Sequence, residues 1–313
     1  MDWLLVALGL VLLLLAGDSL VKGAVNLALR LGVPALIVSL TIVAFGTSAP
    51  ELLISVQAIL DGVPGIALGN VVGSNTANIL LVLGIPALLA TMHTSECDTR
   101  HSYLQMIAAS VLFIGLAFLG TFTWVSGLIL LAALAAMLTH AFLSARAHRN
   151  SCAQDDVEDV EGADPDMPWK KIILFLVLGL IGLPLGANLL VDGATSIART
   201  YGVSETVIGL TLVAVGTSLP ELATTVMAAL RRQADVALGN VIGSNMFNLL
   251  GIIGVASLVG PLPVEQTFLD FDLWIMLGAS LLLIPFVFLR QDISRLWGVL
   301  LTALYLGYLF IIL

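Results

Sequence analysis

Long apolar runs, separated by short polar segments, occupy most of the 313-residue chain. A helix of roughly 20 apolar residues crosses a hydrocarbon core of about 30 Å, and ten runs reach that length. The runs are solidly apolar instead of alternating, which favours helices over a membrane barrel. The pattern predicts an all-α membrane protein with ten transmembrane helices. The predicted spans are 3–30, 34–60, 65–91, 102–120, 123–145, 169–199, 204–230, 235–260, 268–289 and 293–313.

The composition also indicates a membrane protein. Hydrophobic residues make up 59% of the chain and charged residues 11%, with a mean hydropathy of +1.08, whereas soluble domains have about 25% charged residues. The net charge of −9 says little about a transport path, because seven acidic residues lie in one polar segment, 155–166. We interpret residues 146–168 as an acidic linker between a first unit, 1–145, and a second unit, 169–313.

The basic residues predict the orientation of the chain. If the N-terminus lies outside, the loops after helices 1, 3, 5, 7 and 9 are cytoplasmic and contain or adjoin eleven of the twelve Lys and Arg residues, as the positive-inside rule requires. Arg199 is then outside, and Asp192 is expected at the outer interface. The start, Met1-Asp2-Trp3, lacks the basic region of a signal peptide, so we expect a retained first helix. We predict a multi-pass protein of the cell (inner) membrane, with a cytoplasmic linker.

The sequence matches itself at an offset of 170 residues. Residues 40–57 match 210–227 at 11 of 18 positions, and residues 67–84 match 237–254 at another 11 of 18. Five helices separate the copies, and because an odd number reverses the side from which a copy enters the membrane, we predict two inverted five-helix repeats. Inverted repeats with interrupted helices are typical of secondary transporters, whose substrates bind near the midplane where the repeats meet.

The first matched block carries a proline and then a glutamate near the centre of each predicted span. It reads Gly46-Thr47-Ser48-Ala49-Pro50-Glu51 in one copy and Gly216-Thr217-Ser218-Leu219-Pro220-Glu221 in the other. A mid-helix proline removes a donor and clashes with the carbonyl four residues back, which here belongs to Gly46 or Gly216. The freed oxygens and the glutamates suit a cation. A carboxylate at mid-membrane costs about 3 kcal/mol or more, so it indicates a function.

The second matched block is rich in Gly, Ser and Asn. It reads Gly69-Asn70-Val71-Val72-Gly73-Ser74-Asn75 with Asn78, and Gly239-Asn240-Val241-Ile242-Gly243-Ser244-Asn245 with Asn248. The glycine spacing predicts that neighbouring helices approach closely, so that oxygen-bearing side chains of helices 2, 3, 7 and 8 converge. Neither block contains His or Cys, and all-oxygen ligands suit Ca²⁺ and Na⁺. For any single hydroxyl, the alternative is a structural role in satisfying freed backbone groups.

These doubled blocks resemble the cation/calcium exchanger superfamily, whose signature is two inverted alpha repeats of the form GTS-x-PE followed by GN-x-x-GSN-x-x-N. The resemblance covers the whole chain and is close to the prokaryotic sodium/calcium exchangers. It implies that calcium is bound by the motif glutamates and threonine carbonyls, here Glu51, Glu221, Thr47 and Thr217. It implies that sodium is bound by the neighbouring serines, two backbone oxygens and the downstream Ser and Asn, here Ser48, Ser218, Ala44, Ala214, Ser74, Ser244, Asn78 and Asn248.

Two departures bear on the expected selectivity. Potassium-dependent exchangers and certain archaeal members carry Asp where this chain has Asn248, which argues against potassium dependence. Proton/calcium exchangers tend to place a further glutamate after GN, where this chain has Val72 and Gly73, then Ile242 and Gly243. The resemblance therefore favours sodium as the counter-ion of calcium.

The expected function is antiport of sodium against calcium by alternating access at an acidic midplane site. One Ca²⁺ neutralises Glu51 and Glu221, several Na⁺ compete for the same ligands, and the resemblance implies that helices 1 and 6 slide against a rigid core. The alternatives are a proton/calcium exchanger, a cation channel and a membrane enzyme. No G-x-S-x-G, H-E-x-x-H or P-loop pattern supports an enzyme. The expected partners are calcium, sodium and the lipid bilayer, with no cofactor, nucleic acid or obligate protein partner.

Three other groups of residues are interpreted without a transport role. His93, Cys97 and His101 recur every four residues in the loop after the third helix, a spacing that could hold a soft metal but has no partner motif. The acidic linker lacks the spacing of an EF-hand and is expected to be solvated. Asp18 and Lys22 lie one helical turn apart and are predicted to form an ion pair.

Overall fold

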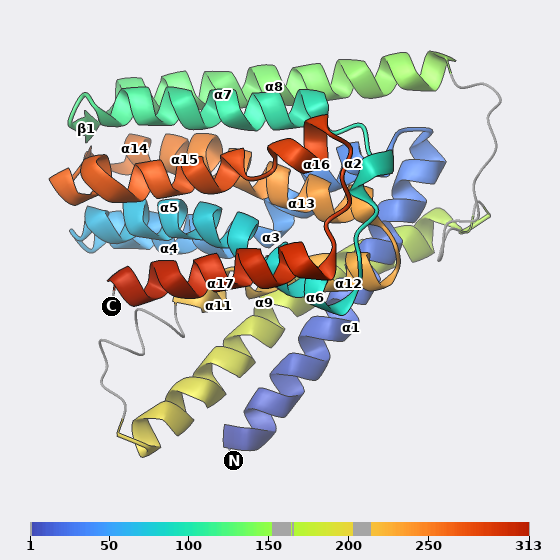
Figure 1. The fold of residues 1–313 in the computed structure, drawn as a ribbon, viewed down its shortest axis with the longest axis horizontal. Coiled ribbons are helices and arrows are strands. Elements are labelled where there is room, and N and C mark those ends of the chain that lie inside the picture. Colours follow the sequence, from blue (N-terminus) through green and yellow to red (C-terminus); the bar gives the residue numbers. More distant parts are fainter. Residues whose placement is uncertain (1, 152–163, 165, 203–213, 313) are drawn as a thin grey trace.

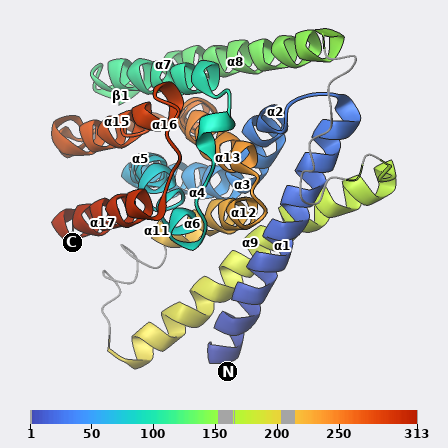
Figure 2. The ribbon, with the colours of Figure 1, turned by 45° about the vertical axis from the view of Figure 1, so that its right-hand side comes forward.

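The computed structural model describes residues 2–151, 164, 166–202 and 214–312 of the chain, and almost all of them are helical. Two long helices, α1 (Asp2–Leu31) and α9 (Trp169–Thr200), lie side by side and run obliquely beside a bundle of the other helices (Figure 1). Figure 2 shows that both long helices project beyond the bundle at the end where the N-terminus lies. The chain is therefore divided into a two-helix element and a bundle.

Glycines permit the close contact between α1 and α9. A Cβ atom at Gly9 would lie 2.6 Å from the Leu190 backbone nitrogen, and one at Gly179 would lie 2.5 Å from Leu20 Cβ. These distances leave no room for a side chain at either glycine. Small residues at helix crossings let backbones approach each other in a bilayer, where the hydrophobic effect does not drive association. The contact joins the first helices of the two matched units.

The predicted span 34–60 is broken beside its glutamate. It consists of α2 (Ala35–Val38), the π-helical η1 (Ser39–Val43), α3 (Ala44–Thr47) and α4 (Ala49–Leu60). The helix axis bends by 42° between α3 and α4, at Ser48, whose φ of −84° and ψ of 5° leave the helical range. Pro50 thus lies in the first turn of a new helix instead of within a continuous one, and there its missing N–H breaks no helical hydrogen bond.

The second copy has the corresponding break at Ser218. The short α11 (Ala214–Thr217) precedes it, and α12 (Leu219–Leu230), with Pro220 in its first turn, follows it. Residues 203–213, which belong to the predicted span 204–230, lie outside the described residues. Both copies therefore place a glutamate directly after a proline in the first turn of a helix.

The second matched block forms helices that pack against these breaks. Its elements are α5 (Pro64–Leu80) in the first copy and α13 (Ala234–Met246), the π-helical η4 (Phe247–Ile252) and α14 (Ile253–Val259) in the second. A Cβ atom at Gly243 would lie 2.4 Å from the Leu40 carbonyl oxygen, which confirms the predicted close approach for this copy. Gly73 corresponds to Gly243 at the offset of 170, but residue 210, which corresponds to Leu40, lies outside the described residues.

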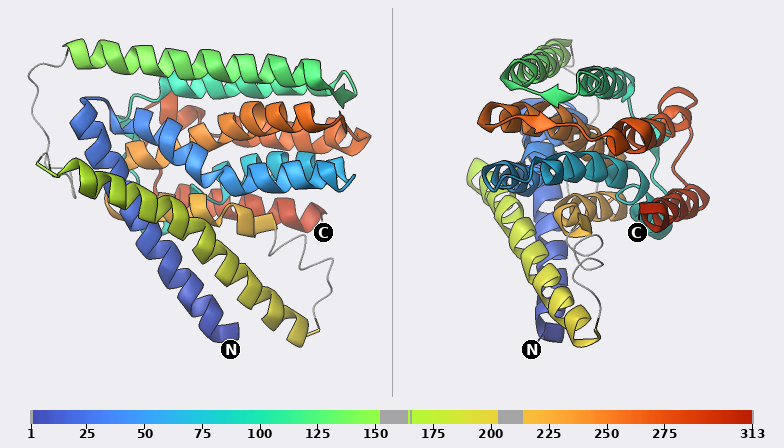
Figure 3. Two further views of the ribbon diagram at one scale, coloured as in Figure 1. Left: turned by 180° about the vertical axis from the view of Figure 1, so that it is seen from behind. Right: turned by 90° about the vertical axis from the view of Figure 1, so that its left-hand side faces the viewer.

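The remaining elements complete the bundle. They are α6 (Gly84–Leu89), η2 (Thr94–Glu96), α7 (Arg100–Ala117), α8 (Trp124–Ser151), η5 (Phe268–Asp272), α15 (Leu273–Leu281), α16 (Ile284–Phe288) and α17 (Arg295–Ile312). α7 and α8 lie side by side along one edge of the bundle (Figure 3). An antiparallel pair of short strands, β1 (Thr121–Phe122) and β2 (Leu262–Pro263), ties their loop to the loop after α14. The apolar pattern did not predict these strands.

By length and composition alone, six of the described helices could cross a membrane, or seven if the bent pair α2–α4 counts as one span. α12 and α17 are apolar but shorter, so ten spans stay a prediction. The candidate span in α8, Trp124–Leu143, agrees with the fifth predicted span, 123–145, although the helix itself continues to Ser151. The apolar pattern marks the part of a helix that lipid surrounds, and a helix can continue into water beyond it.

The outer surface of the described chain is strongly apolar. Trp3 is 69% exposed, Leu296 78% and Phe310 85%. Such a surface is unusual for a soluble monomer, but it suits contact with lipid. Polar side chains are instead buried in the bundle, where Asn240, Ser244 and Asn248 have no exposed surface. The chain is a multi-pass membrane protein whose polar groups face inward.

Candidate ion-binding site

Two buried carboxylates lie at the helix breaks. Glu51 has no exposed surface and Glu221 is 1% exposed, and they occupy the first turns of α4 and α12. The two breaks meet, because Ser48, three residues before Glu51, donates a hydrogen bond to Glu221. Neither oxygen of Glu51 has a hydrogen-bond partner among the described residues, and the same holds for Oε2 of Glu221. Because uncompensated buried charge is costly, this arrangement calls for a positive charge between the two glutamates.

Hydroxyl groups link the two breaks across the repeat. Ser48 Oγ of the first copy donates to Glu221 Oε1 of the second copy at 3.1 Å. Thr47 Oγ1 donates to Asn240 Oδ1 at 3.3 Å, and Thr217 Oγ1 donates to Asn70 Oδ1 at 3.5 Å. Each threonine therefore binds an asparagine of the opposite copy. The site is shared by the two halves of the chain.

Asn70 and Asn240 brace the turns that carry the glutamates. Asn70 Nδ2 donates to the Glu51 carbonyl oxygen and to Ser55 Oγ, both at 3.3 Å. Asn240 Nδ2 repeats this pattern with the Glu221 carbonyl oxygen at 3.4 Å and with Thr225 Oγ1 at 3.2 Å. Neither asparagine belongs to the predicted ligand set. Asparagine occupies this position in both copies, at the offset of 170, and this match is the sequence signal that could have identified the two residues as part of the site.

A second pair of asparagines clamps α5 to α13. Asn75 Nδ2 donates to the Asn245 carbonyl oxygen at 3.2 Å, and Asn245 Nδ2 donates to the Asn75 carbonyl oxygen at 3.4 Å. Asn78 Nδ2 also donates to Asn245 Oδ1, at 3.0 Å. Asn78 Oδ1 and both polar atoms of Asn248 have no partner among the described residues. The buried amide oxygens of Asn78 and Asn248 thus have lone pairs that suit a hard cation.

The structure buries all ten predicted ligand residues that have side-chain oxygens, each at 9% exposure or less. They are Thr47, Ser48, Glu51, Ser74, Asn78, Thr217, Ser218, Glu221, Ser244 and Asn248. The carbonyl oxygen of Ala44 accepts the backbone N–H of Ser48 at 3.0 Å and the hydroxyl of Thr47 at 3.3 Å. Ala214 is the first residue of α11. The metal role of these residues stays a prediction.

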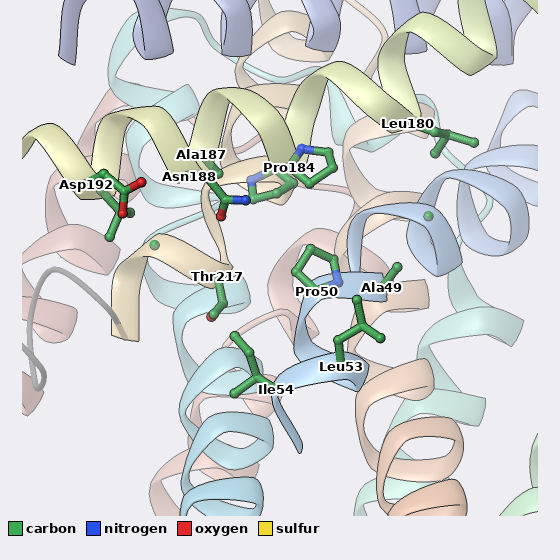
Figure 4. Close-up of a pocket in the computed structure, with 14 residues that line it drawn as sticks. Ala49, Pro50, Leu53, Ile54, Leu180, Pro184, Ala187, Asn188, Asp192 and Thr217 are labelled. Carbon is green, nitrogen blue, oxygen red and sulfur yellow. The ribbon is translucent and has the colours of Figure 1, made fainter. Parts of the chain in front are cut away.

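A cavity of about 370 Å³ separates the middle of α9 from the two helix breaks. Figure 4 shows Asn188, Asp192 and Pro184 of α9 on one side and Pro50 and Thr217 on the other. Pro220 also lines it, so the cavity reaches the residues that precede both glutamates. Among the described residues that line the cavity, Asp192 is the only charged one. The cavity therefore borders both helix breaks on the side that faces α9.

The residues assigned no transport role have ordinary partners where they are described. His93 Nδ1 lies 2.9 Å from Asp292 Oδ2. Burial raises the pKa of Asp292, but its contacts with Ser95 and His93 outweigh this effect and hold the pKa below its ordinary value. The predicted pair of Asp18 and Lys22 is confirmed at 2.8 Å. The acidic linker between Asp155 and Glu161 lies outside the described residues.

Comparisons with known proteins agree with this geometry. The family model described as "Sodium/calcium exchanger protein" matches residues 1–143 and 171–313. The chain is 36% identical to the "Putative antiporter CaxA" of Alkalimonas amylolytica, over 98% of this chain and 97% of that protein. It is 36% identical to the "Sodium/calcium exchanger MaX1" of Methanosarcina acetivorans, over 99% and 98%. Among solved structures, the sodium-calcium exchanger NCX_Mj soaked with Na⁺ and Sr²⁺ matches with a TM-score of 0.83, 33% identity, and coverage of 98% of this chain and 97% of that one.

Proposed function

Because the chain belongs to the sodium/calcium exchanger protein family, we propose that it is an antiporter that exchanges Na⁺ for Ca²⁺ across a membrane. The observation that carries the proposal is the pair of buried glutamates, Glu51 and Glu221, at two helix breaks that the hydrogen bond from Ser48 to Glu221 brings together. An exchanger couples two ions when its binding site can be sealed from water only while cations neutralise the site. A channel, by contrast, needs no such coupling between ions.

We infer that the chain forms ten transmembrane helices in two inverted repeats, 1–145 and 169–313, joined by the linker 146–168. Two observations support this inference. Both copies break a helix at a serine beside a Pro-Glu pair, Ser48 and Ser218. The cross-copy hydrogen bonds of the threonines and asparagines also repeat in both directions. A two-fold relation between oppositely directed copies places one shared site at their interface.

Calcium is proposed to bind between the two glutamates, with the carbonyl oxygens of Thr47 and Thr217 as further ligands. Calcium takes six to eight oxygen ligands from carboxylates, carbonyls and amides, and the two carboxylates supply the two negative charges that a divalent ion neutralises. The proposed sodium ligands surround this position. They are Ser48, Ser218, Ser74, Ser244, Asn78, Asn248 and the backbone oxygens of Ala44 and Ala214. Sodium and calcium then compete for one set of groups.

Competition at a shared acidic site enforces exchange. Without a cation, Glu51 and Glu221 leave two uncompensated charges in a low-dielectric interior, which disfavours any conformation that seals the site from water. One calcium ion or several sodium ions remove this penalty. Alternating access then moves α1 and α9 along the bundle, with the helices of the matched blocks as the fixed core. The glycine-lined contact between α1 and α9 suits them to move as one element.

The N-terminus is proposed to lie outside a cell (inner) membrane, with the linker 146–168 in the cytoplasm. The distribution of basic residues supports this orientation. In this orientation α9 ends on the outer side, because its last residues lie on the same side as the N-terminus (Figure 2).

Calcium uptake into vesicles tests the proposed exchange. Purified protein in sodium-loaded vesicles is expected to take up calcium when sodium is removed outside, and Glu51→Gln or Glu221→Gln should each abolish uptake because one site charge is lost. Glu265→Gln, at an exposed glutamate, is the matched control and should leave uptake unchanged. Wild-type uptake by either site variant contradicts the proposal. Uptake driven by a pH gradient without sodium would identify a proton/calcium exchanger instead.

A further inference from the structure

An ion cluster joins α1 to the end of α12. Asp18 of α1 pairs with Lys22 one turn away at 2.8 Å and with Arg231, the residue that directly follows α12. Both Nε and Nη2 of Arg231 contact the Asp18 carboxylate. The side chains of Asp18 and Arg231 are 19% and 21% exposed, so the pair is largely shielded from water. Charged hydrogen bonds of this kind are stronger than exposed ion pairs.

The same surfaces are in direct backbone contact next to the ion cluster. A Cβ atom at Gly17 would lie 2.9 Å from the carbonyl oxygen of Ala223. α1 and α12 are thus packed together between Arg231 and the turn that carries Glu221. No water-filled route can pass between two helices at this separation.

The corresponding surfaces of the other copy are apart. At the offset of 170, Gly17 corresponds to Ala187 and Ala223 corresponds to Leu53. Both Ala187 and Leu53 line the cavity beside α9, and Figure 4 shows them on its opposite sides. The pair of positions that touches in one copy is therefore separated by the cavity in the other.

The charges of the two copies also differ. Asp18, Lys22 and Arg231 correspond at the same offset to Asn188, Asp192 and Asp61. This second set contains two acidic residues and no cation, so it cannot form the ion pair that joins α1 to α12. If α9 moved toward the helix breaks and closed the cavity, no ion pair like that of Asp18 and Arg231 would hold it there.

We propose that the pair of Asp18 and Arg231 is a latch that keeps the route between α1 and α12 shut. The absence of a counterpart in the other copy makes the ion-free exchanger rest with the cavity beside α9 open. This inference rests on the proposed alternating access. To open the route on the α1 side, α1 must separate from α12, and the latch must break.

Thiol labelling of the ion-free protein in detergent tests the latch. In a background with Cys97→Ala and Cys152→Ala, Ala223→Cys reports opening on the α1 side and Leu53→Cys reports the cavity side. Adding Asp18→Asn or Arg231→Gln should accelerate labelling of Ala223→Cys by a hydrophilic maleimide about tenfold, because losing a charged hydrogen bond raises the minor open population by that order. Labelling of Leu53→Cys should slow or stay unchanged.

Two controls and a rescue isolate the pair. Arg232→Gln removes the neighbouring, exposed arginine, and Lys22→Gln removes a cation that lies on α1 itself, so neither should accelerate labelling of Ala223→Cys. The charge exchange Asp18→Arg with Arg231→Asp should restore slow labelling.

Three results would overturn the latch. One is unchanged labelling of Ala223→Cys in Asp18→Asn, and another is equal acceleration by Arg232→Gln. The third is acceleration at both reporter positions together, which indicates loosening of the whole fold. The labelling experiment uses ion-free protein and needs no transport. Its result therefore tests the latch independently of sodium-driven uptake, which tests the proposed function.

Discussion

Asn70 and Asn240 connect the local geometry of the site to its construction from two copies. Each donates from its amide nitrogen to the backbone carbonyl of the glutamate in its own copy, and each accepts from a threonine of the other copy. An amide side chain both donates and accepts hydrogen bonds, so one residue fixes a glutamate-bearing turn and ties it to the opposite break. The position of each carboxylate thus depends on both halves of the chain.

Replacing Asn240 with leucine should weaken both stability and exchange. Asn240→Leu has a similar volume but removes the hydrogen bonds to Thr47, Thr225 and the Glu221 carbonyl oxygen, which should lower the free energy of unfolding by about 1–3 kcal/mol. Thermal unfolding in detergent and vesicle uptake measure the two effects. Gln57→Leu is the control, because its bond to Asp61 is exposed. Unfolding of Asn240→Leu at the wild-type temperature, with normal uptake, would show that Asn240 braces nothing.

The sequence predicted the acidic centre of the site better than its supports. Glu51 and Glu221 stand out because a carboxylate in an apolar run has a large cost. Asn75 and Asn245, by contrast, bind each other's backbone, and such pairing depends on how two helices cross. Helical periodicity gives the face on which a residue lies, but it does not give the partner across that face.

At the scale of helices, close packing against the broken span depends on glycine. α13 lies so near η1 and α3 that a Cβ atom at Gly243 would be 2.4 Å from the Leu40 carbonyl oxygen and 2.6 Å from Ala44 Cβ. The first of these contacts is with backbone, which cannot rotate away as a flexible side chain can. The position of α13 against η1 and α3 therefore depends on glycine at position 243.

Gly243→Ala should destabilise the protein, because adding a methyl group to this contact forces the backbones apart at a cost of about 1–3 kcal/mol. Gly115→Ala is the matched control: Gly115 also lies within a helix, but no atom of the described chain lies within 4 Å of its Cβ position. Its unfolding temperature should be unchanged or slightly higher, since alanine favours helix by up to about 1 kcal/mol. Equal unfolding temperatures for the two variants would contradict this account of the packing.

The irregular parts of the helices could not be predicted from apolar runs. The π-helical segments η1 and η4 continue the hydrophobicity of their neighbours, so composition does not distinguish them from α-helix. The breaks at Ser48 and Ser218 were predicted approximately, because a proline removes a helical donor and clashes with the carbonyl group four residues back. The last residues of α8, up to Ser151, lie beyond the apolar run, so the apolar pattern does not predict that they are helical.

At the scale of the whole molecule, two similar halves occupy different environments. The offset of 170 relates their sequences, yet one set of equivalent surfaces is packed between α1 and α12 and the other borders the cavity beside α9. An alternating-access exchanger requires this inequality, because access from both sides at once would uncouple the ions. The repeat could be predicted from the sequence, whereas the side that is open could not, since it depends on differences among a few charged residues.

Equilibrium binding of calcium to the purified protein, measured with increasing sodium, tests the central claim most directly. We expect a single calcium ion per chain, displaced as sodium rises, and loss of this binding in Glu51→Gln and in Glu221→Gln alike, because the two carboxylates hold one ion together. Calcium that stays bound in either variant, or that binds alongside sodium without displacement, would contradict a shared site.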